Sequence, residues 1–342
     1  MNETVINALA LSPYEGLSRR KFLRIMGAAG IALAGYPLVV RSAAAGEAIR
    51  IKNAAPGEDL FAYIRSAKGK FDQTLYQQVI GAANDFKEGD LTIGVGAKDD
   101  ATRKTARELL ANTTIKDLYE HPVFVDDLQK LIWQTTDQAQ YEKVKDWTMG
   151  ELKEFLLTQS ESEIKGIMNG LTSDTIGCVP KLMTNEELIA FGQKIFNPLP
   201  GTQMGSKGYM GARIQPNSPT DHPDDVQWQT FNAFAYATGD IVIGTNPVDS
   251  QVVSVAAVEE ALKDVVDTFK LNDIIPWCVL SHIDVQAEVA QQYPGSVETM
   301  FQSLAGTDDC NKTFDVTIDK ILKYAQSKKG KRYGLYFETG QG

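Results

Sequence analysis

Apolar residues recur at three- and four-residue spacing from about residue 57 to residue 196. This spacing places them on one face of an α-helix and predicts a series of amphipathic helices. Asp99 and Asp100 precede the apolar pattern that begins at Ala101 and are typical of a helix start. Thr148 stands three residues before Glu151, as in a capping box. The predicted helices span residues 60–66, 73–86, 101–112, 114–120, 149–157, 161–171 and 185–196.

Beyond residue 200 the pattern changes to short apolar runs with helical spacing between most of them. This alternation is typical of an α/β fold with a parallel sheet or barrel. A helix is predicted over 226–237, with Asp224 and Asp225 placed to cap its start. The predicted strands span residues 209–215, 241–246, 277–283, 299–304 and 334–338, and their C-terminal polar residues are Arg213, Asn246, His282, Gln302 and Glu338.

The first 45 residues carry a net positive charge, whereas the rest of the chain is acidic. Arg19 and Arg20 lie in the sequence LSRRKFLR, which precedes an apolar run over 25–40 and three alanines at 43–45. This order predicts a twin-arginine signal over 1–45 and export to the periplasm. The alternative is an exposed basic patch before a core helix.

The segment PLPG at 198–201 then divides a helical region, 46–200, from an α/β region, 201–342.

Charge and metal-ligand content narrow the classes of function. The chain has 34 basic and 44 acidic residues, a net charge of −10, which argues against a nucleic-acid surface. Its three cysteines and three histidines are dispersed and contain no C-x-x-C pair, so we predict neither a disulfide framework nor a zinc site. The segment DHPDD at 221–225 offers metal-ligand types, but a solvated loop and helix start is the favoured interpretation.

Function is expected at the C-terminal ends of the strands, where barrel enzymes build their active sites. Arg213 and Gln215 are two residues apart and therefore share one strand face. Together with Asn246 they offer hydrogen-bond donors and acceptors, and Glu338 offers a carboxylate for an ammonium group. Such a set suits a small substrate with both a hydroxyl and an amine. A structural Arg–Glu ion pair and a turn role for Asn before Pro remain open as alternatives.

Five motifs resemble the large subunit of ethanolamine ammonia-lyase: GARIQPN (211–217), GDIVIGTNPV (239–248), CVLSH (278–282), FQS (301–303) and LYFETGQG (335–342). The resemblance implies a (β/α)8 TIM-type barrel, an adenosylcobalamin cofactor and a small-subunit partner in a hetero-oligomer. It further implies radical conversion of ethanolamine to acetaldehyde and ammonia. In that family the matching positions place Arg213, Gln215, Asn246 and Glu338 on the substrate, with Arg213 and Glu338 catalytic, and Pro247 and Gln302 against the corrinoid.

Two features depart from this family pattern. The family is usually found in the cytoplasm or in bacterial microcompartments, whereas residues 1–45 predict export. Five strands are predicted where a closed barrel needs eight, so we expect 201–342 to be the first part of a barrel and the chain to be a fragment or a shortened form. A noncatalytic homologue that binds an amino alcohol, a corrinoid or a partner subunit is the alternative, and a related amino-alcohol substrate also remains open.

Overall fold

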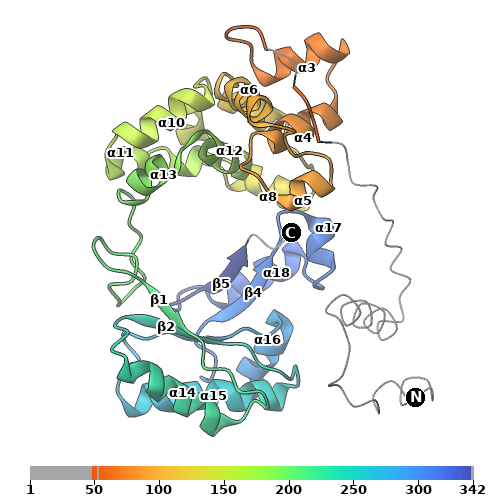
Figure 1. The fold of residues 1–342 in the computed structure, drawn as a ribbon. Coiled ribbons are helices and arrows are strands. Elements are labelled where there is room, and N and C mark those ends of the chain that lie inside the picture. The colour runs from red at the N-terminus through yellow and green to blue at the C-terminus, as the bar shows by residue number, and fades with distance from the viewer. Residues whose placement is uncertain (1–47, 52–53, 340–342) are drawn as a thin grey trace, which may run out of the picture.

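The computed structural model describes residues 48–51 and 54–339, which form a helical part followed by an α/β part (Figure 1). The predicted signal over 1–45 and the end of the LYFETGQG motif lie outside the described residues. None of the described helices combines the length and the apolar character that a membrane-spanning segment needs.

The two predicted helix starts, at Asp99 and Thr148, are confirmed. Asp99 Oδ1 accepts a hydrogen bond from the Thr102 amide at 2.8 Å, and Thr148 forms the predicted capping box with Glu151. Both caps satisfy amides that lack a partner inside the helix. The helices are α3 (Leu60–Lys68), α4 (Gln73–Ala82), α5 (Glu88–Thr92), α6 (Asp100–Ala111), α7 (Ile115–Glu120), α8 (Asp127–Thr135), α9 (Gln138–Val144), α10 (Met149–Thr158), α11 (Glu161–Lys165), α12 (Ser173–Cys178) and α13 (Asn185–Gly192), with 3-10 turns η1 (Met168–Gly170) and η2 (Val179–Leu182).

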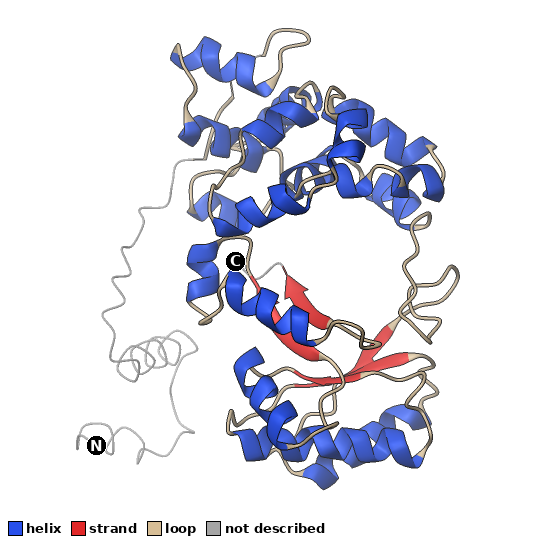
Figure 2. Cartoon of the chain, turned by 180° about the vertical axis from the view of Figure 1, so that it is seen from behind, coloured by secondary structure: helices blue, strands red, loops and turns tan. Residues whose placement is uncertain are grey.

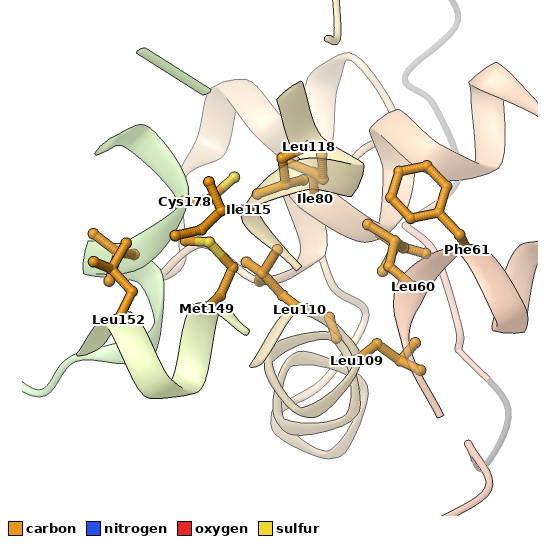
Figure 3. Close-up of a cluster of buried hydrophobic side chains, with 14 of the residues drawn as sticks. Leu60, Phe61, Ile80, Leu109, Leu110, Ile115, Leu118, Met149, Leu152 and Cys178 are labelled. Carbon is orange, nitrogen blue, oxygen red and sulfur yellow. The ribbon is translucent and has the colours of Figure 1, made fainter. Parts of the chain in front are cut away.

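One apolar core holds these helices together (Figure 3). Leu109 and Leu110 of α6 pack with Leu60 of α3 and with Met149 and Leu152 of α10, and all five side chains are almost completely buried. Burial of each large apolar side chain contributes about 1.5–3 kcal/mol. The predicted three- and four-residue spacing therefore identifies the faces that form this core.

Three of the predicted helices are too long. The prediction over 185–196 is wrong beyond Gly192, where α13 ends. The prediction over 73–86 is wrong beyond Ala82, because Asn84 donates its side-chain amide to Asp90 instead of continuing the helix. The prediction over 161–171 is wrong beyond Lys165, where the chain turns. A Cβ atom on Gly170 would lie 2.3 Å from the Tyr141 amide nitrogen, so only glycine fits there. Helices α5, α8, α9 and α12 were not predicted.

The α/β part alternates strands and helices, with the helices lying against the strands (Figure 2). The first and third strands were predicted too long. The first, predicted over 209–215, spans only Ala212–Ile214. The third ends early because Ser281 already turns back to the Val279 carbonyl and His282 is the N-cap of the next helix. The elements are β1 (Ala212–Ile214), α14 (Pro223–Ala235), β2 (Ile241–Thr245), α15 (Val252–Thr268), β3 (Trp277–Val279), α16 (Ile283–Gln292), β4 (Met300–Leu304), α17 (Asp308–Lys312), α18 (Ile318–Ser327) and β5 (Leu335–Thr339).

All five strands pair in parallel, which confirms the predicted α/β class. They form two ladders, β1–β2–β3 and β4–β5, and the described residues contain no closed barrel. Between the ladders, the Thr299 amide and hydroxyl both donate to the Trp277 carbonyl, at 3.3 and 2.8 Å. The strands therefore follow one another in space in the order of the sequence, with a break in regular pairing after the short β3.

The two faces of the first ladder have different roles. Ile241 and Ile243 of β2 are fully buried in a core that also contains Val255 and Leu262 of α15. Successive side chains of a strand point to opposite faces, so Gly244 lies on the face that points away from α15. That second face carries the candidate site.

Candidate functional site

Arg213 lies on β1 and connects two distant strands. Its Nη2 donates to Gln215 Oε1 at 2.9 Å, which confirms that the two side chains share a strand face. Its Nη1 donates to the Tyr336 hydroxyl on β5 at 3.3 Å. The guanidinium group is therefore oriented by one partner from each end of the α/β part.

Gly244 of β2 makes room for the arginine side chain. A Cβ atom at this position would lie 2.9 Å from Arg213 Cδ, which is closer than real Cβ contacts. The side chain of Arg213 therefore lies across the backbone of the neighbouring strand. A glycine inside a strand often marks such a close approach.

Glu338 extends the same face along β5. It lies two residues after Tyr336, so both side chains point to the side of β5 that faces Arg213. Glu338 is half-buried, and no hydrogen bond or ion pair joins its carboxylate to the described residues. Arg213 bonds Tyr336 and Gln215 instead, so the alternative of a structural Arg213–Glu338 pair is wrong.

Asn246 and Pro247 follow β2 directly. The Asn246 amide donates to Asn217 Oδ1 at 3.0 Å, and the Thr245 hydroxyl donates to the same oxygen at 3.0 Å. The Asn246 side chain is exposed and makes no hydrogen bond within the described part of the chain. The Asn246 backbone is thus fixed, while its side-chain amide can bond a ligand. Pro247 lies half-buried beside it.

Gln302 lies apart from this group. Its Oε1 accepts from the Ile283 amide at 3.1 Å, its Nε2 donates to the Ser303 carbonyl at 3.1 Å, and the residue is only 5% exposed. The preceding residue, Phe301, packs its ring against Tyr336 at 5.7 Å, so Gln302 points to the opposite face of β4. The structure therefore brings Arg213, Gln215 and Glu338 to one face, with Asn246 just beyond the end of β2, but places Gln302 behind β4.

Cys278 lies in register with Gly244 on β3. Burial raises the pKa of its thiol to about 12, with Glu259 adding to this effect and Arg213 opposing it. A buried thiol with a high pKa stays protonated at neutral pH and is a poor nucleophile. We therefore assign Cys278 no role as a nucleophile.

His282 has a structural role. Its Nδ1 accepts from the Asp284 amide at 3.2 Å, and its Nε2 lies 2.9 Å from the Phe314 carbonyl. Ligand atoms of His282, Asp284 and Asp315 lie within 4.8 Å of one another. The Lys320 ammonium already bonds both carboxylates, at 2.7 and 3.2 Å. This cluster is therefore an ion-pair network that anchors α16 and α18.

The segment at 221–225 starts a helix, as expected, but the capping residue differs from the prediction. His222 is the N-cap of α14, and its Nδ1 accepts from the Asp224 amide at 3.3 Å. Asp224 and Asp225 lie in the first turn, where their charge favours the positive end of the helix. The prediction that these two aspartates cap the helix is wrong.

Sequence reasoning missed Tyr336 and Gly244, which hold and admit the Arg213 side chain. Tyr336 has a signal in the sequence, because it stands two residues before Glu338 and so shares its strand face. Gly244 stands out only as a glycine inside an otherwise β-branched run.

Comparison with known proteins identifies the family of the chain. A family model described as "Ethanolamine ammonia lyase large subunit (EutB)" matches residues 71–342. The ethanolamine ammonia-lyase large subunit of Salmonella typhimurium is 30% identical over 280 residues, which cover 78% of this chain and 60% of that protein. The protein of the same name from Escherichia coli K12 is 30% identical over 279 residues with the same coverage, so the chain spans 60% of the length of these relatives. On this match the chain belongs to the family of ethanolamine ammonia-lyase large subunits.

Proposed function

We propose that this chain is a catalytic large subunit of an adenosylcobalamin-dependent lyase that converts ethanolamine to acetaldehyde and ammonia. One observation carries the proposal. Arg213 is held by Gln215 and Tyr336 on the face where the Glu338 carboxylate has no partner among the described residues. On one face, the Arg213 guanidinium can donate hydrogen bonds to a substrate hydroxyl, and the Glu338 carboxylate can accept them from a substrate ammonium.

The four family positions divide naturally between the two ends of ethanolamine. Glu338 would accept hydrogen bonds from the substrate ammonium. The hydroxyl end would be bound by Arg213, Gln215 and the side-chain amide of Asn246. A site built to hydrogen-bond a hydroxyl rejects an analogue without one, because its polar groups would be left without partners.

Adenosylcobalamin would supply the radical chemistry, while the chain supplies binding and orientation. Pro247 is half-buried, and Val248 beside it is 68% exposed, so an accessible apolar surface follows Asn246 in the chain. Such a surface would suit the edge of a corrinoid. Gln302 does not fit this contact, because it is only 5% exposed, bonds the Ile283 amide and the Ser303 carbonyl, and points to the opposite face of β4.

The complete fold proposed for this function is a (β/α)8 barrel. The five parallel strands would be its first five, in the region 201–342, after the helical region 46–200. Support comes from the strand order, which follows the sequence as it does in a singly wound barrel. A small subunit and a hetero-oligomer would complete the assembly.

We also propose that the protein is periplasmic, on the basis of Arg19 and Arg20 in the twin-arginine pattern. Replacing both arginines with lysine and fractionating the cells tests this location. Retention of the variant in the cytoplasm is the expected result. The same distribution for both forms, each with an intact amino terminus, would instead favour the cytoplasm or a bacterial microcompartment.

The activity itself is tested with the complete chain, adenosylcobalamin and an ethanolamine ammonia-lyase small subunit, by measuring acetaldehyde. We expect acetaldehyde that depends on both additions and falls in Glu338→Gln. Binding of ethanolamine or adenosylcobalamin without acetaldehyde would identify a noncatalytic homologue. Faster release of ammonia from 2-amino-1-propanol than from ethanolamine would assign a related amino-alcohol substrate.

A further inference from the structure

Asp221 lies in the loop between β1 and α14 and makes several hydrogen bonds to another loop. Its carboxylate accepts from the Val248 amide at 2.8 and 3.0 Å and from the Asp249 amide at 2.8 Å. The Ser254 hydroxyl also donates to it, at 3.2 Å. The residue is only 7% exposed, so these are buried hydrogen bonds to a charged acceptor.

The backbone at Asp221 is in the left-handed region, with φ of 53°. Among residues other than glycine, aspartate and asparagine tolerate this conformation best. The conformation costs free energy, and the surrounding bonds maintain it. The carboxylate also lies near the N-terminus of the long helix α15, where a negative charge is favourable.

The residues that Asp221 holds come directly after two candidate site residues. Asn246 and Pro247 immediately precede Val248. Asn217 fixes the other side of the same segment through the Asn246 amide. The loop after β1 therefore holds the loop after β2 at both ends of the Asn246–Pro247 pair.

We propose that Asp221 is a positioning residue that sets Asn246 and Pro247 in place relative to Arg213. This inference rests on the proposed function, because it assigns a role within the same site. It also explains why a buried carboxylate is found in a loop with no cation bonded to it among the described residues. Backbone amides and a hydroxyl supply its hydrogen bonds.

The test uses the complete chain and the variant Asp221→Asn, which keeps the size of the side chain and its tolerance of positive φ. The matched control is Asp315→Asn, since Asp315 has φ of 55° but lies exposed beside Lys320. Ser254→Ala is a milder variant that removes one bond to the same carboxylate. Hydrogen–deuterium exchange of residues 245–250 and ethanolamine binding by calorimetry are measured for each.

In Asp221→Asn we expect amide exchange over 245–250 to be at least tenfold faster and the ethanolamine Kd to be about tenfold higher. Ser254→Ala should change both in the same direction by less, and Asp315→Asn should match the wild type. Unchanged exchange, or faster exchange with an unchanged Kd, would overturn the positioning role. If the wild type binds no ethanolamine, the proposed function fails, while exchange at Asn246 still decides whether Asp221 fixes this segment.

Discussion

Arg213 and Tyr336 are joined by a hydrogen bond of 3.3 Å, although 123 residues separate them in the sequence. The bond links β1, the first strand of the α/β part, to β5, the last one described. It fixes the Arg213 guanidinium over the face that also carries Glu338. The site therefore depends on both ends of the α/β part being folded together.

Arg213→Lys should lower kcat/KM for ethanolamine at least tenfold. A lysine ammonium cannot reproduce the planar fork that bonds Gln215 and Tyr336 together. Steady-state acetaldehyde formation measures the effect. Arg107→Lys is the matched control, because Arg107 bonds Asp85 within the helical part. Equal losses in the two variants would contradict a specific role for Arg213.

Gly244→Ala should lower kcat/KM by about 100-fold, because a displacement of about 1 Å at a positioning group has effects of this size. The new methyl group would lie 2.9 Å from Arg213 Cδ and push the side chain aside. Gly334→Ala is the control, since a Cβ there meets nothing within 4 Å. Wild-type kinetics in Gly244→Ala would show that the close approach does not matter for activity.

Glu338→Gln should lower kcat/KM by about 100-fold, the size of effect seen when one preorganised charged contact is removed. Because the Glu338 carboxylate has no partner among the described residues, the Tm of the variant should differ little from that of the wild type. Thermal melting and steady-state kinetics together check the prediction. Glu288→Gln, an exposed change on α16, is the control. A large loss of Tm with unchanged kcat/KM would return Glu338 to a structural role.

Glu259→Gln should stabilise the protein more at pH 8 than at pH 5. The Glu259 side chain on α15 is fully buried, and its two oxygens have no hydrogen-bond partner in the described part of the chain. Burial raises its pKa from 4.5 to about 8, although Lys328 opposes the change. Between these values the folded protein keeps a proton that the unfolded chain has released, so the free energy of unfolding falls as pH rises.

The fall amounts to about 1.4 kcal/mol for each pH unit in that window. Thermal melting of Glu259→Gln and wild type at both pH values measures the difference. Glu260→Gln, the exposed neighbour, controls for general charge effects. The same difference in Tm at pH 5 and pH 8 would show that Glu259 does not titrate in this way.

Asp308→Ala should weaken the contact between the helical and α/β parts. Asp308 Oδ2 accepts from the Asp127 amide at 2.8 Å, and the Asp308 amide donates to Asp126 Oδ2 at 2.9 Å. These bonds join the N-termini of α8 and α17, which lie next to each other in Figure 1. Loss of a cap of this kind costs about 1 kcal/mol.

Urea unfolding measures that loss, and limited proteolysis of the connecting segment 193–211 shows whether the two parts separate. Asp309→Ala is the control, because the Asp309 side chain is 95% exposed and pairs with nearby Lys312 on the same helix. Matching stability and cleavage rates for the two variants would contradict a docking role for Asp308.

Local features of the sequence predicted local structure well. The Asp99 and Thr148 caps and the five parallel strands follow from residue types within one turn or one run. The shared face of Arg213 and Gln215 also follows, because strand side chains alternate with a fixed period of two. These features needed no knowledge of distant parts of the chain.

Contacts between residues far apart in the chain could not be predicted from the sequence pattern. The crossing of Arg213 over Gly244 depends on the pairing register of two strands, and the Asp126–Asp308 contact joins residues 182 apart. The position of Gln302 behind β4 depends on which face of that strand packs on α16, which a five-residue run does not reveal. Tertiary packing decides each of these.

The most direct test of the site is calorimetric binding of ethanolamine and propylamine to wild type, Arg213→Lys and Glu338→Gln. The two ligands share an ammonium group, and only ethanolamine has the hydroxyl. We predict that wild type binds ethanolamine at least tenfold more tightly than propylamine, that Arg213→Lys reduces this preference, and that Glu338→Gln weakens both ligands equally. Equal binding of the two amines by wild type, unchanged by either substitution, would contradict the assignment of Arg213 to the hydroxyl and Glu338 to the ammonium.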